Sequence, residues 1–268
     1  MELSGKIVII TGASMGIGAA TARAFAQAGA KVVLAARSAD LLAALAREIG
    51  AERALAVPTD VTVRAQVDSL MQRTVEEFER IDILINNAGV GMAGTIATLN
   101  PAHFEKIFAT NVLGPLYAMQ AVVPYLRQNG GGVILNVSSM VSKLPIPMIG
   151  SYRATKSALN TLSQNARMEL ARDNIRVIIV YPNITASNFY MNTLDARNAG
   201  QVSFDQHRRA QSCEFVAQKI VAGARREPRE VFMGGGSRVF AFVTSLFPAR
   251  FEKMMGGARP TESVQRAE

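Results

Sequence analysis

A tyrosine and a lysine four residues apart, Tyr152 and Lys156, are the side chains of this 268-residue sequence best suited to proton transfer. Positions i and i+4 share one face of a helix, so the lysine ammonium can lie beside the phenol and favour its ionised form. Tyr152 then becomes a usable acid or base. Ser139, thirteen positions upstream, completes the set of side chains that this chemistry would draw on.

A glycine-rich loop, Thr11–Gly18, lies between a β-branched run and a helical stretch near the amino terminus. Such a loop can present backbone N–H groups to a pyrophosphate at the start of a helix. It has no Gly-Lys-Ser/Thr ending, which argues against a phosphoryl-transfer loop. We therefore predict a redox site that holds a dinucleotide. The loop residues expected to contact the dinucleotide are Gly12, Ser14, Gly16, Ile17 and Gly18.

The elements that must position these groups alternate between apolar runs and stretches with helical spacing. Nearly continuous apolar strands are typical of a parallel sheet covered on both faces. The sequence thus predicts an α/β fold, a doubly wound Rossmann-type parallel sheet of about seven strands with helices on both faces. The expected strands are Lys6–Ile10, Lys31–Ala35, Ala54–Val57, Ile81–Ile85, Gly132–Val137, Arg176–Val180 and Glu230–Met233. Helices are expected at Gly18–Ala28, Leu41–Ile49 and Val63–Phe78.

The end of the second strand indicates which dinucleotide is bound. Ala36 and Arg37 stand where a carboxylate would accept hydrogen bonds from an adenosine ribose 2′-hydroxyl. An arginine fork pairs well with a 2′-phosphate, so we expect NADP(H) to be preferred over NAD(H), with the Ser14 hydroxyl as a second contact. The alternative is that Arg37 is a solvated residue after a strand.

Asp60 follows the third strand and has two interpretations. Its carboxylate could accept a hydrogen bond from the adenine amino group, and the next residue, Val61, is expected to contact the cofactor as well. Asp60 could equally cap the helix that begins near Val63.

Five motifs occur in one order: Thr-Gly-x-x-x-Gly-x-Gly, then Asn86-Asn-Ala-Gly89, then Asn111, then Ser139, then Tyr152-x-x-x-Lys156. In this order they resemble the short-chain dehydrogenase/reductase family, over roughly residues 4 to 236. The resemblance implies hydride transfer between nicotinamide C4 and a carbonyl carbon. A non-catalytic dinucleotide-binding sensor or scaffold is the alternative, because fold alone does not fix function.

The resemblance also implies roles for the catalytic set. Tyr152 would exchange a proton with the substrate oxygen, Lys156 would hold the nicotinamide ribose, and Ser139 would hydrogen-bond the substrate oxygen. Ser138 would point to the opposite face of the strand. Asn111 would hold a water in a proton relay to the lysine, or bond backbone at a helix irregularity, or do both.

Two further segments are expected to touch the cofactor. Asn86 is assigned to framing the sheet, whereas Asn87, Ala88 and Gly89 are assigned to the cofactor. Asn183 replaces the glycine that the family usually has after the sixth strand, and asparagine tolerates the positive φ that such a turn would need. Ile184 and Ser187 are the remaining cofactor candidates.

An apolar substrate is expected from the residues that border the site in relatives. They lie in Met140–Ile149 and at Phe189, Tyr190 and Met191. We predict a hydrophobic carbonyl or secondary alcohol such as a lipid, a steroid-like ring or an aliphatic ketone. The alternative is that these side chains belong to the ordinary core.

The carboxyl-terminal part carries an unexpected apolar run. Residues 1–236 are expected to form a single dinucleotide-binding catalytic domain with a substrate loop near 185–212, and 237–268 an apolar extension with a polar tail. The run Val239–Phe247 is shorter than the roughly 20 residues that span a bilayer. It could make peripheral membrane contact over residues 238–255, with Arg238, Arg250 and Lys253 toward headgroups. Pocket cover or dimer packing is the favoured interpretation.

Composition limits the other possibilities. With 49% hydrophobic and 19% charged residues the chain can bury one large core. The net charge of +8 is scattered, so no nucleic-acid partner is expected. One cysteine, Cys213, with His103 and His207 offers no metal cluster or internal disulfide.

The first strand begins almost at once, which predicts a cytoplasmic protein. The family resemblance implies a homodimer or homotetramer built through Pro101–Gln128 and Tyr152–Ala171.

Overall fold

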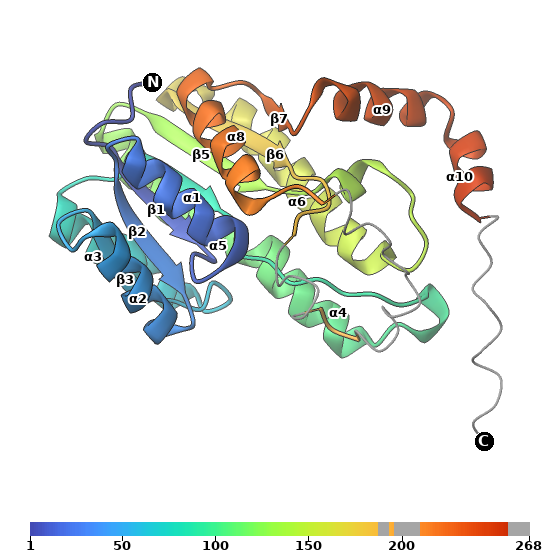
Figure 1. The fold of residues 1–268 in the computed structure, drawn as a ribbon, viewed down its shortest axis with the longest axis horizontal. Coiled ribbons are helices and arrows are strands. Elements are labelled where there is room, and N and C mark those ends of the chain that lie inside the picture. The colour runs from blue at the N-terminus through green and yellow to red at the C-terminus, as the bar shows by residue number, and fades with distance from the viewer. Residues whose placement is uncertain (187–192, 196–209, 257–268) are drawn as a thin grey trace.

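Seven parallel strands form one sheet in the order β3-β2-β1-β4-β5-β6-β7 (Figure 1). The structure is a computed structural model and describes residues 1–186, 193–195 and 210–256. The predicted fold class is confirmed, and no strand end differs from its predicted position by more than two residues. They are β1 Ile7–Thr11, β2 Lys31–Ala36, β3 Ala54–Pro58, β4 Ile83–Asn86, β5 Gly132–Val137, β6 Ile175–Tyr181 and β7 Glu230–Phe232.

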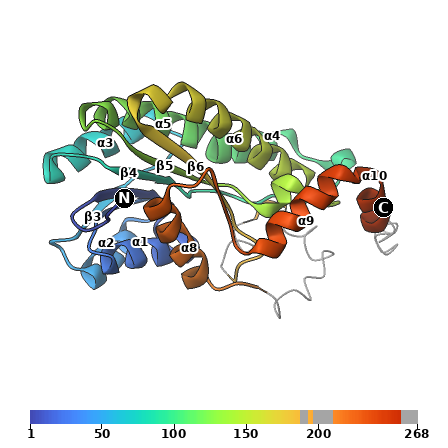
Figure 2. The same ribbon diagram turned by 90° about the horizontal axis from the view of Figure 1, so that it is seen from above.

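The helices cover both faces of this sheet. Figure 2 shows α1, α2 and α8 on one side and α3, α5 and α6 on the other. The bounds are α1 Gly16–Gln27, α2 Ala39–Ile49, α3 Arg64–Phe78, α4 Pro101–Phe108, α5 Gly114–Gln128, α6 Gly150–Glu169, α8 Cys213–Arg226, α9 Gly235–Leu246 and α10 Pro248–Gly256. Short helical segments are η1 Ile96–Thr98, the π-helical η2 Ala109–Leu113, η3 Met140–Lys143 and η4 Ala171–Asp173.

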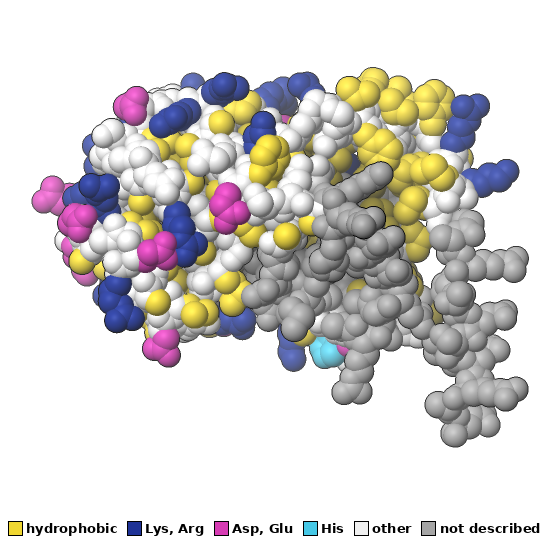
Figure 3. Space-filling view, in the orientation of Figure 1, with side chains coloured by type: hydrophobic (Ala, Val, Ile, Leu, Met, Phe, Trp, Pro, Cys, Tyr) yellow, Lys and Arg dark blue, Asp and Glu magenta, His cyan; other side chains and the backbone are white. Residues whose placement is uncertain are grey.

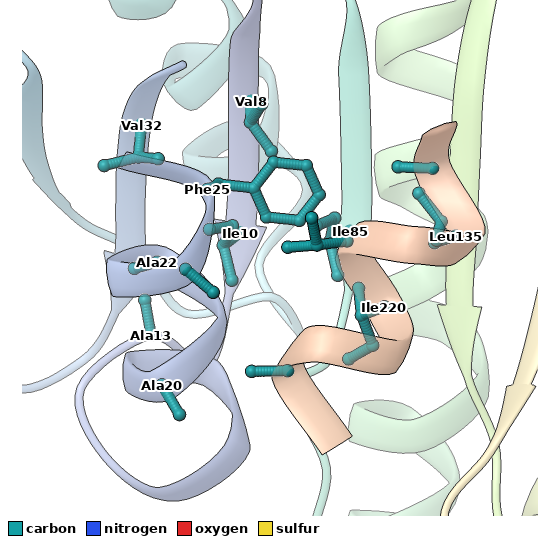
Figure 4. Close-up of a cluster of buried hydrophobic side chains, with 14 of the residues drawn as sticks. Val8, Ile10, Ala13, Ala20, Ala22, Phe25, Val32, Ile85, Leu135 and Ile220 are labelled. Carbon is teal, nitrogen blue, oxygen red and sulfur yellow. The ribbon is translucent and has the colours of Figure 1, made fainter. Parts of the chain in front are cut away.

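Successive residues of a strand enter cores on opposite faces of the sheet, as the period of two in a strand requires. Phe25 of α1 is fully buried and packs against Val8 and Ile10 of β1 (Figure 4). Ile220 of α8 completes this core from the same side. Ile9, the residue between the two β1 positions, faces α3 and α5 instead. Burial of both faces explains why the strands read as continuous apolar runs.

Strand order reverses between β1 and β4, which pair directly in parallel register. β2 and β3 extend the sheet to one side of β1, and β5 to β7 extend it from β4 to the other. In open α/β sheets, ligands bind outside the carboxyl ends of the strands at such a switch point. The glycine-rich loop follows β1 at this position.

Within the part of the chain that the structure describes, one helical stretch, Pro101–Gln128, is long and apolar enough to cross a membrane by length and composition alone. It comprises α4, η2 and α5, and half of its most apolar window is buried inside the fold. Val122 and Leu126 of α5 pack in the core beneath the sheet. These contacts are those of a core helix.

The carboxyl-terminal apolar run forms a helix rather than an extended segment. α9 begins just after β7 and ends at Leu246, and α10 starts at Pro248. Both helices lie at one end of the molecule, beyond the last strand (Figure 1).

Candidate active site

The glycine-rich loop is held against residues 87 and 88 by hydrogen bonds. The Asn87 side-chain amide donates to the carbonyl oxygens of Thr11 and Gly12, at 3.0 and 3.2 Å. The Thr11 hydroxyl accepts from the backbone N–H groups of Asn87 and Ala88, at 3.0 and 3.1 Å. These hydrogen bonds join the segments that follow β1 and β4 at the carboxyl-terminal edge of the sheet.

Two glycines of the loop permit close backbone approach. Gly12 has φ 66°, in the left-handed region, and a Cβ there would lie 2.8 Å from the Ala88 Cα. A Cβ at Gly18 would lie only 2.1 Å from the Gly12 carbonyl oxygen. Since no side chain fits at either position, the loop packs directly against Ala88 and against the first turn of α1.

A cavity of about 1310 Å³ runs along this edge of the sheet. It brings together the sequence-predicted cofactor residues that the structure describes and three of the four catalytic candidates. Those lining it are Gly12, Ser14, Gly16, Ile17, Gly18, Arg37, Asp60, Val61, Asn87, Ala88, Gly89, Ser139, Tyr152, Lys156 and Ile184. Asn111 lies just behind the wall, and Ser187 lies outside the described residues. Phe189, Tyr190 and Met191 lie outside them too.

The Tyr152–Lys156 pair lies on α6 and faces this cavity. The Lys156 Nζ lies 5.8 Å from the centroid of the Tyr152 ring. Lys156 is 3% exposed, and its Nζ donates to the Val137 carbonyl oxygen at 2.9 Å. Burial lowers the pKa of Lys156 to about 8. A cation next to a phenol in a shielded site is the arrangement that general acid–base chemistry needs.

The two serines after β5 both line the cavity, but their hydroxyls have different partners. Ser138 is buried, and its hydroxyl donates to the Lys156 carbonyl at 3.4 Å. Ser139 is half-buried and lines the cavity, where its Oγ accepts from the Val141 N–H at 3.3 Å. That contact caps η3, so the Ser139 side chain has a defined position.

Asn111 lies in the π-helical turn between α4 and α5 and is fully buried. Its Oδ1 accepts from the Val90 N–H at 2.8 Å, and its Nδ2 donates to the Val90 carbonyl at 2.9 Å and to the Thr155 hydroxyl at 3.0 Å. A Cβ at Gly89 would lie 3.3 Å from Asn111 Oδ1 and 3.4 Å from Lys156 Nζ. Asn111 therefore bonds backbone at a helix irregularity, while its water-relay role stays a prediction.

Asn86 points away from the cavity into a buried polar network. Its Nδ2 donates to Asn136 Oδ1 at 2.8 Å, and Asn136 Nδ2 donates to the Ser163 hydroxyl at 2.7 Å. These bonds tie β4 and β5 to α6, which carries Tyr152. The framing role assigned to Asn86 agrees with this geometry.

Arg37 and Asp60 line the far end of the cavity. Arg37 is exposed, and among the residues that the structure describes its guanidinium has no ion-pair partner. Asp60 Oδ1 accepts from the Thr62 N–H at 2.9 Å and from its hydroxyl at 2.7 Å. Because α3 begins at Arg64 with no side-chain cap, the helix-cap interpretation of Asp60 is wrong.

Asn183 does not have the positive φ that was expected for the turn after β6. Its φ is absent from the positive values found in the described chain, so the turn after β6 does not use the left-handed region. Its Nδ2 instead donates to the Ser237 hydroxyl at 3.2 Å, at the start of α9. The substitution of the family's glycine ties this turn to the carboxyl-terminal extension.

Several cavity residues were not found from the sequence. Ser237 and Phe240 of α9 and Met255 of α10 line the cavity. The apolar run that contains Phe240 was the available signal, and the pocket-cover interpretation agrees with its place. Leu194 also lines the cavity and forms a β-bridge with Met92. No sequence pattern marked that contact.

A second contact holds the same segment in place. The His103 Nδ1 of α4 lies 3.0 Å from both carboxylate oxygens of Asp195.

Among the described residues, no group of His, Cys, Asp and Glu could hold a metal ion.

This arrangement defines a Rossmann-type, dinucleotide-binding oxidoreductase. The family model described as short chain dehydrogenase matches residues 6–198. An uncharacterised oxidoreductase of Staphylococcus haemolyticus is 38% identical over 181 residues, which are 68% of this chain and 78% of the relative. The chain belongs to the short-chain dehydrogenase/reductase family and is an NAD(P)-dependent enzyme that acts on a CH–OH or carbonyl group.

Solved structures agree with this family and differ in their ligands. A 7α-hydroxysteroid dehydrogenase complexed with NADH and 7-oxo glycochenodeoxycholic acid is 30% identical, with a TM-score of 0.74 over 83% of this chain and 88% of that chain. An L-sorbose reductase from Gluconobacter frateurii complexed with NADPH and L-sorbose is also 30% identical, with a TM-score of 0.76 over 87% and 97%. These two structures of similar fold thus differ both in their nicotinamide dinucleotide and in their second ligand.

Proposed function

We propose that this protein reduces a hydrophobic carbonyl, or oxidises the corresponding secondary alcohol, with NADP(H) as cofactor and Tyr152 as general acid or base. The observation that carries this proposal is the placement of Tyr152 and buried Lys156 in the wall of the cavity that begins at the glycine-rich loop. The bound nicotinamide supplies or accepts the hydride. Side chains of the protein transfer the proton to or from the substrate oxygen and stabilise the charge that develops on it.

In the reducing direction, the Tyr152 hydroxyl gives its proton to the carbonyl oxygen as the hydride reaches the carbonyl carbon. The Lys156 ammonium stabilises the phenolate that remains. The Ser139 hydroxyl donates a hydrogen bond to the same oxygen and stabilises its developing negative charge. Asn111 holds the backbone of Val90 and the Thr155 hydroxyl beside this pair, where it would also position a relay water.

Arg37 supports the preference for NADP(H). Its guanidinium is exposed at the end of β2, lines the cavity and lacks a carboxylate partner in the described chain. A 2′-phosphate would supply two oxygens to the arginine fork, and the Ser14 hydroxyl lies in the same wall. NADH would offer Arg37 only a neutral hydroxyl.

The substrate end of the cavity supports an apolar ligand. Apolar side chains approach it from the segment after Ser139, from the Met92–Leu194 bridge and from both carboxyl-terminal helices. They are Met92, Met140, Val141, Leu144, Ile146, Ile149, Leu194, Phe240 and Met255. The 7-oxo glycochenodeoxycholic acid complex is a precedent for a steroid-sized substrate in a similar fold.

We also propose that the chain assembles as a homodimer or homotetramer through α4–α5 and α6 and that it works in the cytoplasm. Residues 1–236 would form the catalytic unit, and 237–268 its extension. Size-exclusion chromatography with light scattering would measure the assembly state.

The test is a panel of ketones and secondary alcohols, followed by the absorbance change of NADPH and of NADH. Tyr152→Phe should lower kcat by about 10²- to 10⁴-fold while nucleotide binding, measured by fluorescence titration, is retained. Tyr125→Phe, which removes a hydroxyl from α5, is the matched control and should leave kcat unchanged. Nucleotide binding without turnover of any compound would favour the sensor or scaffold alternative. Faster turnover of small sugars than of apolar ketones would contradict the substrate class.

A further inference from the structure

We propose that α9 and α10, the C-terminal helix pair, dock the protein on an anionic lipid surface and place the substrate cavity at that surface. The observation behind it is an outer stripe of apolar side chains, on α9 and at the residue that ends it, that the described chain leaves largely exposed; only the Arg250 guanidinium lies over one of them, 5.4 Å from the centroid of the Phe247 ring. The stripe consists of Val239, Phe242, Val243, Leu246 and Phe247, which are 63, 63, 45, 56 and 51% exposed.

The outer stripe follows the spacing of a helix face. Val239, Phe242, Val243 and Leu246 stand at i, i+3, i+4 and i+7, so they project to one side. Large apolar side chains gathered over adjacent turns are unusual on a surface that faces only water. Figure 3 shows hydrophobic side chains gathered over α9.

The opposite face of α9 packs against the rest of the fold, so the helix cannot rotate to bury the stripe. Ala241 and Thr244 are 9 and 7% exposed. Ala241 packs in a small core with Met140 and Tyr181. Phe240 contacts Phe251 of α10 edge-on, with ring centroids 5.8 Å apart. The helix pair is therefore seated on the fold by its inner face and presents its outer face.

The charged residues that flank the stripe indicate which kind of surface binds to it. Arg238 precedes it, and Arg250 and Lys253 follow it, against a single carboxylate at Glu252. All three cations are exposed, and dark-blue side chains lie beside the apolar patch at α10 in Figure 3. A surface of anionic headgroups complements apolar side chains flanked by cations, as in helices that lie in a membrane interface.

A second copy of this chain fits less well. A two-fold contact through the stripe would bring the same patch against itself. The cations at its ends would then face one another with only Glu252 to offset them. Like charges placed together across an interface disfavour that pairing.

The geometry also limits how the helices meet the lipid. α9 has 12 residues, so its length is about 18 Å, shorter than the roughly 30 Å hydrocarbon core. The helix must lie in the plane of the interface. Ser237, Phe240 and Met255 of the same pair line the cavity that contains Tyr152. Lipid-soluble substrate would thus enter beside the docked face, a step that rests on the proposed function.

Vesicle flotation of the full chain tests docking without any turnover. The probes are vesicles of phosphatidylcholine alone and of phosphatidylcholine mixed with phosphatidylglycerol. The wild-type chain should float with the mixed vesicles and much less with phosphatidylcholine, and added salt should weaken the binding. Absence of wild-type flotation with the mixed vesicles would overturn the proposal.

Two variants locate the contact. Phe242→Ser combined with Leu246→Ser should lower the partition coefficient about tenfold or more. Arg250→Gln combined with Lys253→Gln should lower it about fivefold per cation removed. Met168→Ser, at a 69% exposed position on α6, and the pair Arg47→Gln and Arg172→Gln are the matched controls and should bind as wild type. Flotation unaffected by both α9–α10 variants would overturn the assignment to this face.

Two further readouts separate the remaining outcomes. Turnover of a water-soluble ketone by Phe242→Ser/Leu246→Ser should match wild type, which shows that the variant folds. Its turnover of a long-chain ketone dissolved in vesicles should fall, and equal rates would overturn the entry step alone. If the variant instead converts a larger assembly to a smaller one on size exclusion, with flotation unchanged, the stripe joins copies of the chain and the lipid proposal fails.

Discussion

Asn183 and Ser237 hold the turn after β6 against the first turn of α9. The Asn183 Nδ2 donates to the Ser237 Oγ at 3.2 Å, and the hydroxyl lies 3.5 Å from Asn183 Oδ1 for a return bond. Both residues line the cavity. The contact links the cofactor side of the site to the helix that carries Phe240.

Breaking this contact should loosen α9 and the substrate end of the cavity. Asn183→Ala and Ser237→Ala should each lower the free energy of unfolding by about 1 kcal/mol, because a partly buried partner is left without its bond. Both should raise KM for apolar substrates more than they lower kcat. Urea unfolding and steady-state kinetics of the two single variants measure these effects.

The double variant provides the control. Its destabilisation should be smaller than the sum of the single effects by about 0.5 to 1 kcal/mol, because either change alone removes the shared bond. Strict additivity would show that the two side chains do not stabilise each other.

Removing the Arg37 guanidinium should reverse the cofactor preference. Arg37→Ala should raise KM for NADPH about tenfold or more and leave KM for NADH nearly unchanged, since only NADPH presents a phosphate there. Ala36→Asp, at the preceding position, should further favour NADH by supplying a carboxylate for the ribose hydroxyls. Initial rates with each cofactor give both constants.

Arg47→Ala, at an exposed position on α2, is the matched control for net charge. Equal losses for NADPH and NADH in Arg37→Ala would mean that this guanidinium is a solvated residue after a strand.

The sheet was predictable because its strands are buried on both faces. Ile9 and Ile10 enter opposite cores, so neither position of the strand could be polar. The site candidates were predictable because the parallel strands end at one edge, where the loop and the Tyr152–Lys156 pair meet.

Contacts between distant side chains were not predictable in the same way. Asn183 bonds Ser237 only because α9 returns across the cavity, and no local pattern encodes that return. Asp60 fails as a helix cap because α3 begins at Arg64, one turn later than a capping contact would require.

A side chain at Gly18 should damage the cofactor loop more than the same change at an open glycine. Gly18→Ala would place a Cβ 2.1 Å from the Gly12 carbonyl oxygen, so backbone must move. We expect a loss of about 1 to 3 kcal/mol in the free energy of unfolding and weaker nucleotide binding. Gly236→Ala has open space around its Cβ and should change neither quantity. Thermal unfolding with fluorescence titration would measure both, and equal behaviour of the two variants would contradict close packing at the loop.

The buried Lys156 should make stability depend on pH in a defined direction. Burial lowers its pKa from 10.5 to about 8, so the folded state loses the proton before the unfolded state does as pH rises. Between about pH 8 and 10.5 the unfolded state binds more protons, and the free energy of unfolding rises with pH through this group. Below pH 8 the folded state carries a charge that burial penalises by about 3 kcal/mol.

Lys156→Met removes that penalty and also the hydrogen bond to Val137. Without nucleotide, the variant should therefore be more stable than wild type by about 2 kcal/mol near pH 7, after about 1 kcal/mol is subtracted for the lost bond. The difference should shrink as pH rises from 8 to 10.5, although the variant loses activity at every pH. Urea unfolding of both proteins across this range measures the difference. Lys31→Met, at an exposed position, should show no such trend, and a constant difference in Lys156→Met would mean that the ammonium is not penalised by burial.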